Sequence, residues 1–316
     1  MGKSVLVTGG HGFIGHHLVK KLLDNKHYVD VIDSHTTYGT LDHIKLVALL
    51  YQRLQHIGLH SYLVDDIRTT ELQDKYDTVI HFAGFPRQYE TSRFPDEACD
   101  ILARGLVNLF TSLKSVKHFV FISTSMAYGD FSPYVSEDTV CAPKSQYGVM
   151  RLMGEKLVME YCRRFKIKYT IIRPSAVYGP RDTDNRIVGK FFHQALQNKA
   201  LTLKGPYLIL DFTYVDDLVD GIYLTLENPE SHNEIFNLTR SHASPNTIFD
   251  LANAIIRVTG SQSKFIIEDR DLAFPNRSTL SIRKARKLLG FNPRIDLEEG
   301  IERTYEWLRS HTRIPA

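Results

Sequence analysis

Cysteine is scarce in this chain of 316 residues, and the three that occur lie far apart. Cys99, Cys141 and Cys162 form no close pair and no metal-binding spacing, which favours free thiols in a reducing compartment. No apolar run approaches the length of a membrane span. These absences argue against a disulfide-rich secreted domain and a membrane protein, and they predict a cytoplasmic location.

Positive charge exceeds negative charge only slightly, with a formal net charge of +3. The basic residues are scattered, and the absence of a basic block argues against nucleic acid as a partner. Histidine is more frequent, with 14 residues that include His16-His17 and the pair His56 and His60. Because they have no cysteine or acidic partners at ligand spacing, the sequence predicts no metal site.

A glycine-rich turn near the start of the chain is the first positive signal. Residues 3–8 have the pattern of a buried strand, and Gly9, Gly12 and Gly15 follow with the spacing G-x-x-G-x-x-G before a helical repeat. Such glycines allow a tight turn and a close approach of backbone to a pyrophosphate. The next strand ends in Asp33, whose carboxylate would bind ribose hydroxyls and repel a 2′-phosphate. The pattern predicts a dinucleotide site that prefers NAD over NADP.

Strand and helix patterns alternate up to residue 173 and become irregular beyond it. The alternation predicts an α/β fold, a Rossmann-type doubly wound parallel sheet, with a smaller mixed α/β substrate domain at the C-terminus. We expect residues 1–173 to form the NAD-binding domain, with 211–236 returning to it, and 174–210 and 237–316 to form the substrate-binding domain. Several residues fall at carboxyl ends of strands, where ligands bind in such sheets: Gly9, Asp33, Asp66, Ala83 and Thr124.

A tyrosine and a cation, Tyr147 and Arg151, stand four residues apart at the expected start of a helix over residues 147–165. Residues at this spacing share one face of a helix, and a cation there favours the phenolate form of the tyrosine. The hydroxyl of Thr124, which follows the strand predicted at 118–122, would complete the group. The three residues predict a proton-transfer site beside the cofactor.

Motifs along almost the whole chain resemble those of the extended short-chain dehydrogenase/reductases of nucleotide-sugar metabolism, the NAD-dependent epimerase/dehydratase group. They follow the order of that family and lie at residues 8–15, 79–84, 123–129, 145–148, 173–180, 211–217 and 284–293. The resemblance implies an NAD-dependent epimerase that inverts C4 of a UDP-sugar through a transient 4-keto intermediate. It implies that Tyr147 is the acid/base, that Thr124 binds the same sugar oxygen, and that Arg151 takes the place of the family's lysine.

The resemblance also implies a set of binding residues. Those implied for NAD are Gly9, Gly12, Phe13, Ile14, Gly15, Asp33, Ser34, Asp66, Ile67, Phe82, Ala83, Gly84, Tyr147, Arg151 and Pro174. Those implied for the nucleotide sugar are Arg87, Thr124, Ser125, Met126, Ala176, Arg270 and Arg277. It further implies a homodimer in which the helices predicted over residues 95–115 and 147–165 pair across a twofold axis.

Several residues depart from the family pattern and leave the reaction open. Arg151 keeps the charge of the family's lysine but not its shape. Ser125 and Met126 stand where dehydratases and decarboxylases carry acids, which argues against elimination. Two asparagines and an arginine of the family are replaced by Ala176, Leu102 and Leu210. Two alternatives to the epimerase therefore remain: an NAD(H)-dependent oxidoreductase or dehydratase acting on a nucleotide sugar, and an NAD-binding protein with weak or no catalysis.

Overall fold

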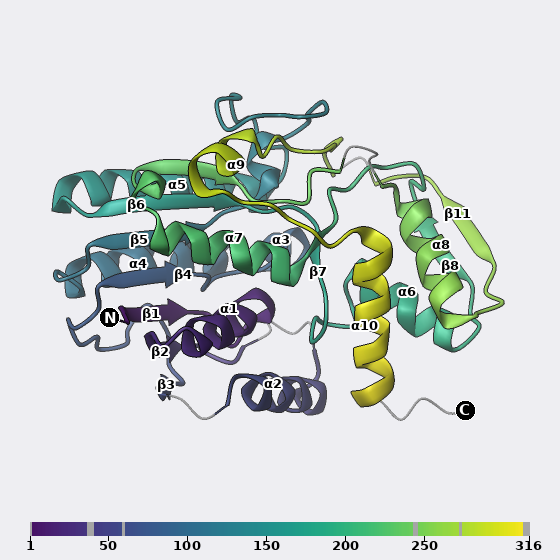
Figure 1. Cartoon of the computed structure of the whole chain (residues 1–316), viewed down its shortest axis with the longest axis horizontal. Helices are drawn as coiled ribbons and strands as arrows, with labels where there is room; N and C mark the ends of the chain where they lie inside the picture. Colours follow the sequence, from purple (N-terminus) through teal and green to yellow (C-terminus); the bar gives the residue numbers. More distant parts are fainter. Residues whose placement is uncertain (1, 37–40, 59–60, 243–245, 272–273, 312–316) are drawn as a thin grey trace.

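A parallel sheet forms the centre of the chain in the computed structural model, which describes residues 2–36, 41–58, 61–242, 246–271 and 274–311. Within these residues the sheet has seven strands in the order β10-β6-β5-β4-β1-β2-β3, and each neighbouring pair is parallel. Helices cover both faces of the sheet (Figure 1). This is the doubly wound α/β architecture that the alternating patterns predicted.

The elements of this sheet follow one another as strand and helix along the chain. The strands are β1 (Ser4–Thr8), β2 (Tyr28–Ile32), β3 (Ser61–Leu63), β4 (Thr78–His81), β5 (His118–Ile122), β6 (Lys168–Arg173) and β10 (Glu234–Asn237). The helices are α1 (Phe13–Asp24), α2 (His43–Ile57), α3 (Gln88–Arg93), α4 (Pro95–Ser112), α5 (Gln146–Phe165) and α7 (Val215–Glu227). Two short 3-10 helices join them, η1 (Ser125–Tyr128) and η2 (Pro229–Ser231).

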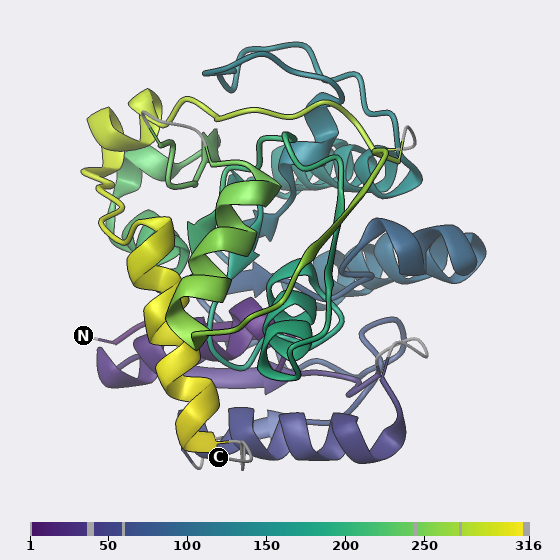
Figure 2. The same ribbon diagram turned by 90° about the vertical axis from the view of Figure 1, so that its right-hand side faces the viewer.

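A second group of elements lies beyond the carboxyl ends of the strands, at the right of Figure 1. It contains β7 (Val177–Tyr178), α6 (Ile187–Leu196), β8 (Leu201–Lys204), β9 (Thr213–Tyr214), α8 (Ile248–Thr259), β11 (Phe265–Glu268) and α10 (Leu297–His311). β7 pairs with β9 and β8 with β11, both in parallel. Figure 2 shows α10 beside α8, and the two helices are in contact. The short helix α9 (Arg283–Leu289) packs instead on α7.

The chain crosses between these two groups more than once. β10 pairs with β6, from Glu234 opposite Thr170 to Asn237 opposite Arg173. α7, which precedes β10, packs against α1 on one face of the sheet (Figure 1). β10 is therefore a strand of the central sheet and α7 packs with its helices, although the chain leaves the sheet between β6 and α7. The domain boundaries at residues 173, 211 and 236 stay a prediction.

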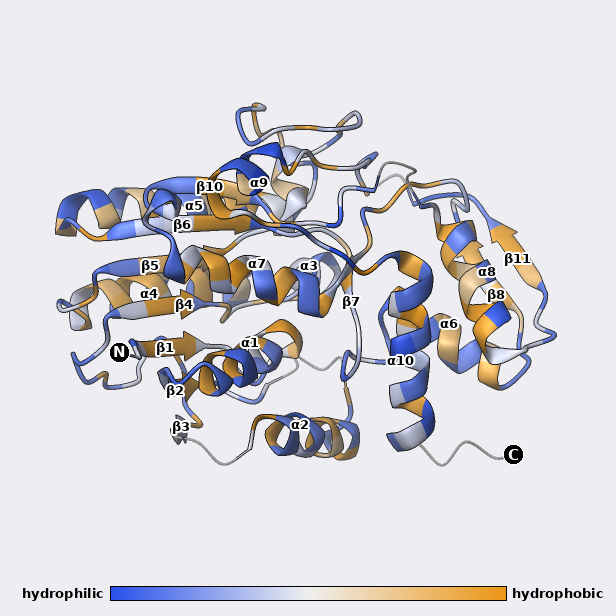
Figure 3. Cartoon of the chain, viewed as in Figure 1, coloured by the Kyte–Doolittle hydropathy of each residue, from blue (hydrophilic) through white to orange (hydrophobic). Residues whose placement is uncertain are grey.

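The strands are apolar along their length because helices cover the sheet on both sides. Val5, Leu6 and Val7 of β1 have no exposed surface, and Val120 and Phe121 of β5 are equally buried. In Figure 3 the apolar colour runs along β1, while the helices around the sheet mix apolar and polar faces. Among the described residues, no helix has both the length and the apolar character that crossing a bilayer requires.

A buried histidine on β5 makes the stability of the fold sensitive to acid. His118 contacts Thr170 Oγ1 of β6 through Nε2 at 2.8 Å, and burial lowers its pKa to about 3. In the unfolded chain a histidine takes up its proton near pH 6.5. The unfolded state therefore binds this proton first, so stability is lost as the pH falls from 6.5 toward 3. By pH 5 the loss from His118 reaches about 2 kcal/mol.

We expect the His118→Gln variant to lose about 2 kcal/mol less of its free energy of unfolding between pH 7.5 and 5 than the parent. Urea denaturation at both pH values measures this difference. His193→Gln is the matched control, because His193 is exposed on α6. Equal losses in the His118 variant and the parent would contradict the assignment.

Candidate active site

The glycine turn between β1 and α1 leaves no room for side chains. A Cβ on Gly9 would lie 2.8 Å from the backbone N of Ala83, and one on Gly15 would lie 2.5 Å from the carbonyl O of Gly9. A Cβ on Gly12 would meet the same oxygen at 3.0 Å. Gly9 also has a φ of +70°, a conformation that residues with a side chain rarely adopt. Glycine at these positions brings β1, α1 and the end of β4 together.

α1 begins at this turn with its first N–H groups available to a ligand. Gly12 is the N-cap and provides no side-chain hydrogen bond, and the first helical turn contains no acidic residue. Phe13 and Ile14 open the helix and are partly buried. The uncapped N–H groups and the positive end of the helix dipole favour a phosphate here. The turn therefore fits the pyrophosphate of NAD.

Asp33 follows β2 and lies at the rim of the glycine turn. Its Oδ2 accepts a hydrogen bond from His11 N at 3.0 Å, and its Oδ1 accepts one from His35 N at 2.9 Å. Ser34 is exposed beside it. The carboxylate keeps further lone pairs that can accept from ribose hydroxyls. No pattern in the sequence singles out His11 and His35, whose Nδ1 and Nε2 atoms lie 2.8 Å apart next to this carboxylate.

Asp66 and Ile67, also predicted to bind NAD, are engaged within the protein. Asp66 accepts hydrogen bonds from Arg68 Nε at 3.0 Å and Arg68 N at 2.9 Å, and the side-chain bond from Arg68 lowers the pKa of Asp66. Ile67 is buried against α4, where a Cβ at Gly105 would lie 2.9 Å from its Cγ2. Both residues anchor the segment after β3, and their contact with NAD stays a prediction.

The turn after β4 lies directly beside the glycine turn, because β4 and β1 are neighbours in the sheet. Phe82 N donates to Thr8 O at 2.9 Å, and Ala83 N donates to Thr8 Oγ1 at 3.5 Å. Gly84 has a φ of +132°, and a Cβ on it would lie 3.8 Å from Arg151 Nη2. This turn therefore connects the predicted cofactor residues of β1 with the predicted catalytic helix.

Tyr147 stands in the first turn of α5, and hydrogen bonds fix the start of that helix. Ser145 is the N-cap, and its Oγ accepts from Gly148 N at 3.1 Å. Tyr147 N donates to Gln88 Oε1 of α3 at 3.0 Å, a contact that the sequence analysis missed. Gly148 approaches η1 so closely that a Cβ on it would lie 2.5 Å from Met126 O. The missing side chain at Gly148 thus brings the tyrosine turn against η1.

Arg151 lies one turn further along α5 and is buried. Its Nη2 donates to Phe85 O at 2.8 Å, and its Nη1 donates to Ile122 O at 3.2 Å. The guanidinium carbon lies 5.4 Å from the centroid of the Tyr147 ring. The cation therefore faces the tyrosine, as the four-residue spacing predicted, but backbone carbonyls of two other segments hold it in place.

η1 begins at the end of β5 and contains the predicted sugar-binding residues Ser125 and Met126, with Thr124 as its N-cap. Thr124 Oγ1 accepts from Met126 N at 3.2 Å, which leaves its O–H hydrogen for another acceptor. Ser125 N donates to Pro174 O at 2.9 Å and so links η1 to the end of β6. Thr124, Ser125 and Met126 are all buried, and residues 123–129 contain no acid.

Ala176 adopts a left-handed backbone conformation with a φ of +38°. This region is uncommon for residues other than glycine, asparagine and aspartate. Its carbonyl O accepts from Thr213 N at 3.3 Å, which ties the segment to β9. The backbone therefore keeps a shape that suits the family's asparagine, while the amide side chain is absent.

The three arginines predicted for the nucleotide sugar have different surroundings. Arg87 donates to Glu90 Oε1 at 2.5 Å and to Asn185 Oδ1 at 2.9 Å, so its guanidinium is engaged within the protein. Arg270 donates to an exposed asparagine side chain, Asn276. Arg277 is partly buried, and burial lowers its pKa to about 10. Within the described part of the chain no carboxylate pairs with Arg277, and a desolvated cation of this kind is suited to an anionic ligand.

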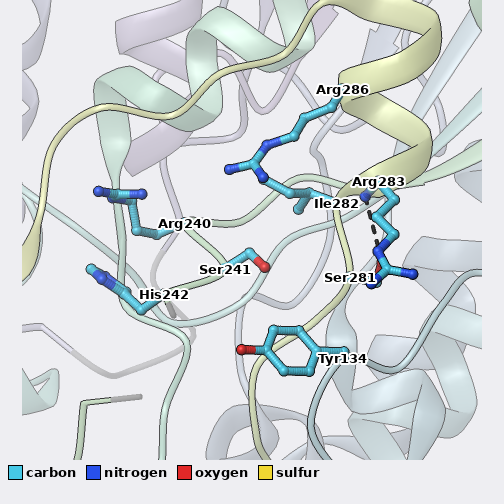
Figure 4. Close-up of a pocket in the computed structure, with 8 residues that line it drawn as sticks. All are labelled: Tyr134, Arg240, Ser241, His242, Ser281, Ile282, Arg283 and Arg286. Carbon is cyan, nitrogen blue, oxygen red and sulfur yellow. Dashed lines mark hydrogen bonds between the residues drawn. The ribbon is translucent and has the colours of Figure 1, made fainter. Parts of the chain in front are cut away.

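A separate cavity of about 460 Å³ lies between the loop after β10, the segment that leads into α9, and α9 itself (Figure 4). It is lined by Tyr134, Arg240, Ser241, His242, Ser281, Ile282, Arg283 and Arg286. Its three guanidinium groups and its lack of a carboxylate suit an anion. Because no residue predicted for NAD or the sugar lines it, this cavity is distinct from the predicted site.

Comparisons with known proteins cover nearly the whole chain. The model of the NAD dependent epimerase/dehydratase family matches residues 5–239. An uncharacterized UDP-glucose epimerase of Bacillus subtilis (strain 168), YtcB, is 33% identical over 314 residues, which cover 97% of this chain and 98% of that protein. A putative UDP-glucose 4-epimerase of Methanocaldococcus jannaschii is 31% identical over 324 residues, which cover 98% of this chain and 99% of that protein.

The fold comparison agrees with the sequence comparison. The crystal structure of UDP-glucuronic acid 4-epimerase from Bacillus cereus in complex with UDP-glucuronic acid and NAD superimposes with a TM-score of 0.88. The two sequences are 30% identical, and the superposition covers 97% of this chain and 99% of that one. The similarity therefore includes the helices and strands of the C-terminal group as well as the central sheet.

Proposed function

Because this chain belongs to the NAD-dependent epimerase/dehydratase family, we propose that it inverts C4 of a UDP-sugar, with Tyr147 as the acid/base. The observation that carries the proposal is the close contact between the tyrosine turn of α5 and η1, which begins next to Thr124. UDP is the proposed nucleotide because the similar proteins are named for UDP-glucose, and the similar crystal structure contains UDP-glucuronic acid.

The residues of the site would have separate roles in proton transfer and in orienting the sugar. NAD, when bound, supplies an acceptor for the hydride at C4 that can also return it. Tyr147 would take the proton of the C4 hydroxyl and give it back after inversion. Thr124 would donate its free O–H hydrogen to the same sugar oxygen. Arg151, whose cation lies against the Tyr147 ring, would offset the negative charge of the phenolate.

Separate groups of residues would bind NAD and the sugar nucleotide. The glycine turn and the N-terminus of α1 would hold the pyrophosphate of NAD, and Asp33 would accept from its ribose hydroxyls. Arg277, which is desolvated and lacks a counter-ion among the described residues, is the proposed partner for the diphosphate of the sugar nucleotide. It would compensate for the missing arginine at Leu210.

The side chains after Thr124 favour inversion over elimination. Elimination or decarboxylation at the 4-keto stage needs a group that handles the proton next to the keto carbon. The positions that would supply it hold Ser125 and Met126, which are 1% and 6% exposed. Neither a hydroxyl without a base nor a thioether can act there, so the 4-keto sugar is expected to be reduced again.

The proposal is tested by incubating the NAD-loaded protein with UDP-glucose, UDP-N-acetylglucosamine and UDP-glucuronate in separate reactions. We expect the C4 epimer of at least one of them, with no net formation of NADH. Repeating the reaction in D₂O should leave C4 free of deuterium, because the hydride stays within the site. A dehydrated or decarboxylated product, or net turnover of NADH, would instead favour the oxidoreductase or dehydratase.

A second candidate function is NAD binding with weak catalysis, and the setting of Arg151 favours it. Two N–H groups of this guanidinium are already bound to Phe85 O and Ile122 O. An arginine held in this way is less free than a lysine to contact the cofactor ribose.

We expect Arg151→Lys to keep epimerase activity and Arg151→Met to lose at least about tenfold in kcat/KM, because only the lysine variant keeps the charge near Tyr147. Steady-state kinetics with saturating NAD measures both. If the parent and Arg151→Lys bind NAD but turn over none of the three UDP-sugars, the binding protein is the better description.

We also propose the homodimer and the cytoplasmic location that the sequence indicates. α4 and α5 pack on each other, and each carries an exposed apolar side chain, Val107 on α4 and Val149 on α5, that a second copy would cover. The three cysteines are free, which suits a reducing compartment. Light scattering after size-exclusion chromatography determines whether the mass is that of two chains.

A further inference from the structure

Three histidines that the proposed reaction does not use come together between α1 and α2. His16 and His17 are neighbours on α1, and His56 belongs to the last turn of α2. Their ring centroids lie 4.1 Å apart for His16–His17, 5.5 Å for His16–His56 and 5.2 Å for His17–His56. One ring nitrogen from each lies within 4.8 Å of the other two. The geometry brings three imidazole donors to one point.

Backbone carbonyls determine which nitrogen of the two α1 histidines is free to bind. His16 Nδ1 lies 3.0 Å from Gly12 O, and His17 Nε2 lies 3.1 Å from Pro180 O. A carbonyl only accepts, so each of these nitrogens must carry the hydrogen. The lone pairs are therefore on His16 Nε2 and His17 Nδ1. A carbonyl that fixes the tautomer in this way is the usual support of a metal-binding histidine.

The two freed nitrogens have unfavourable surroundings. His16 Nε2 is buried without a hydrogen-bond partner among the described residues. His17 Nδ1 faces a carboxylate, Asp216 Oδ1, at 3.6 Å, with no hydrogen between them when Nε2 carries it. Leaving a buried acceptor unsatisfied is unfavourable. A cation between these atoms would satisfy the ring nitrogens and the carboxylate together.

We propose that His16, His17 and His56 form a zinc site that fastens α2 to α1. Three imidazoles with a fourth position for water or a carboxylate are a common zinc environment. Bonds of about 2.0–2.1 Å require the three nitrogens to move somewhat closer than they are now. His56 is only partly buried at the end of its helix, so a rotation of its side chain closes the distance. Asp216 is the nearest candidate for the fourth ligand.

The charges around the cluster are mixed and come close to cancelling. Arg53, Arg181 and Lys20 bring positive charge near the histidines and oppose a metal ion. Asp24 faces His56 and Asp216 faces His17, and both attract it. A small positive excess remains, so we expect a site that binds zinc less tightly than one with several carboxylate or thiolate ligands.

α2 is the element that such a metal would stabilise. Of its fifteen residues only Arg53 and Ile57 are buried, while Ile44, Val47 and Tyr51 are exposed. A helix with so little buried apolar surface is weakly held by packing. Arg53 Nη1 also donates to His11 O of the cofactor turn at 2.9 Å. Zinc at His56 would therefore fix α2 and, through it, the carbonyl of His11.

The test is a metal titration of the full-length protein after treatment with EDTA and removal of the chelator. Co²⁺ absorbance and Zn²⁺ calorimetry should each show one equivalent per chain, with the visible bands of a tetrahedral cobalt site. Zn²⁺ should also raise the Tm of the parent. His56→Ala, which changes a partly exposed residue, should lower the zinc affinity at least about tenfold.

His193→Ala is the matched control, because His193 is exposed on α6 and should leave zinc binding unchanged. His56→Gln provides a second variant of similar size, and NAD binding verifies that each variant is folded. Equal zinc affinities in the parent and both His56 variants, or less than one equivalent bound to the parent, would overturn the proposal. These readouts do not depend on epimerase activity, so the two proposals can fail independently.

Discussion

The Tyr147→Phe variant is expected to epimerise UDP-sugars about 10²–10⁴-fold more slowly than the parent. The phenyl ring keeps the contacts of the tyrosine ring, including the Arg151 cation 5.4 Å from its centroid. Only the hydroxyl that carries the proton is removed. We therefore expect kcat to fall while the KM for the UDP-sugar and the affinity for NAD change little. Steady-state kinetics and NAD titration measure both parts of this expectation.

Tyr89→Phe is the matched control for this variant. Tyr89 lies on α3 next to Gln88, which binds the backbone of Tyr147, but its own side chain is exposed. Removing its hydroxyl should leave kcat unchanged. A Tyr147→Phe enzyme that keeps activity within a few fold of the parent would show that another group moves the proton, and the proposed role of Tyr147 would be wrong.

Glu155→Gln is expected to lower the free energy of unfolding by about 3–5 kcal/mol, the usual cost of breaking a buried ion pair from one side. Glu155 has no exposed surface. It accepts from Arg173 Nε at 2.9 Å, from Arg173 Nη2 at 2.6 Å and from Ser123 Oγ at 2.5 Å. The neutral amide would leave the guanidinium of Arg173 buried without its counter-charge. Urea denaturation of the NAD-free protein measures the loss.

Glu160→Gln on the same helix is the control for Glu155→Gln. Glu160 pairs with Arg163, and both side chains are largely exposed, so its removal should leave stability unchanged. A second variant, Glu155→Leu combined with Arg173→Met, removes both charges and should recover part of the loss. If Glu155→Gln unfolds at the same urea concentration as Glu160→Gln, the buried pair does not stabilise the fold.

This ion pair also explains why the site holds its shape. Glu155 belongs to α5, Arg173 ends β6, and Ser123 follows β5 directly before Thr124. The pair therefore joins the helix that carries Tyr147 to the strand ends that carry the threonine. We expect Glu155→Gln to slow epimerisation as well, although Glu155 contacts no substrate.

The sequence predicted the features that depend on residues close together in the chain. The spacing of Gly9, Gly12 and Gly15 is a local requirement of a strand–turn–helix unit, and the structure shows that none of the three has room for a side chain. The four-residue spacing of Tyr147 and Arg151 likewise places both on one face of α5. Periodicity then predicted the parallel sheet, because strands covered on both faces are apolar along their length.

These local patterns could not predict contacts between segments that are distant in the chain. Arg87 carries a charge that the family resemblance calls for, yet its Nη1 donates to Asn185 Oδ1, 98 residues further along the chain. Arg68, which binds Asp66, also donates to Asp100 of α4. Gln88, on α3, holds the start of α5 by accepting a hydrogen bond from Tyr147 N. Such pairings depend on how helices and turns pack, which no spacing in the chain specifies.

By itself, the sequence determined the doubly wound sheet, the glycine turn between β1 and α1, and the pairing of Tyr147 with Arg151, because each follows from local spacing. It also argued against metal, because the histidines have no cysteine or acidic partner at ligand spacing. In the chain, His56 is separated from His16 and His17 by a strand and most of a helix. His60, its neighbour in that argument, lies outside the described residues. Only the packing of α2 on α1 brings the three imidazoles together. The distance between side chains on two packed helices cannot be read from the number of residues that separate them in the chain.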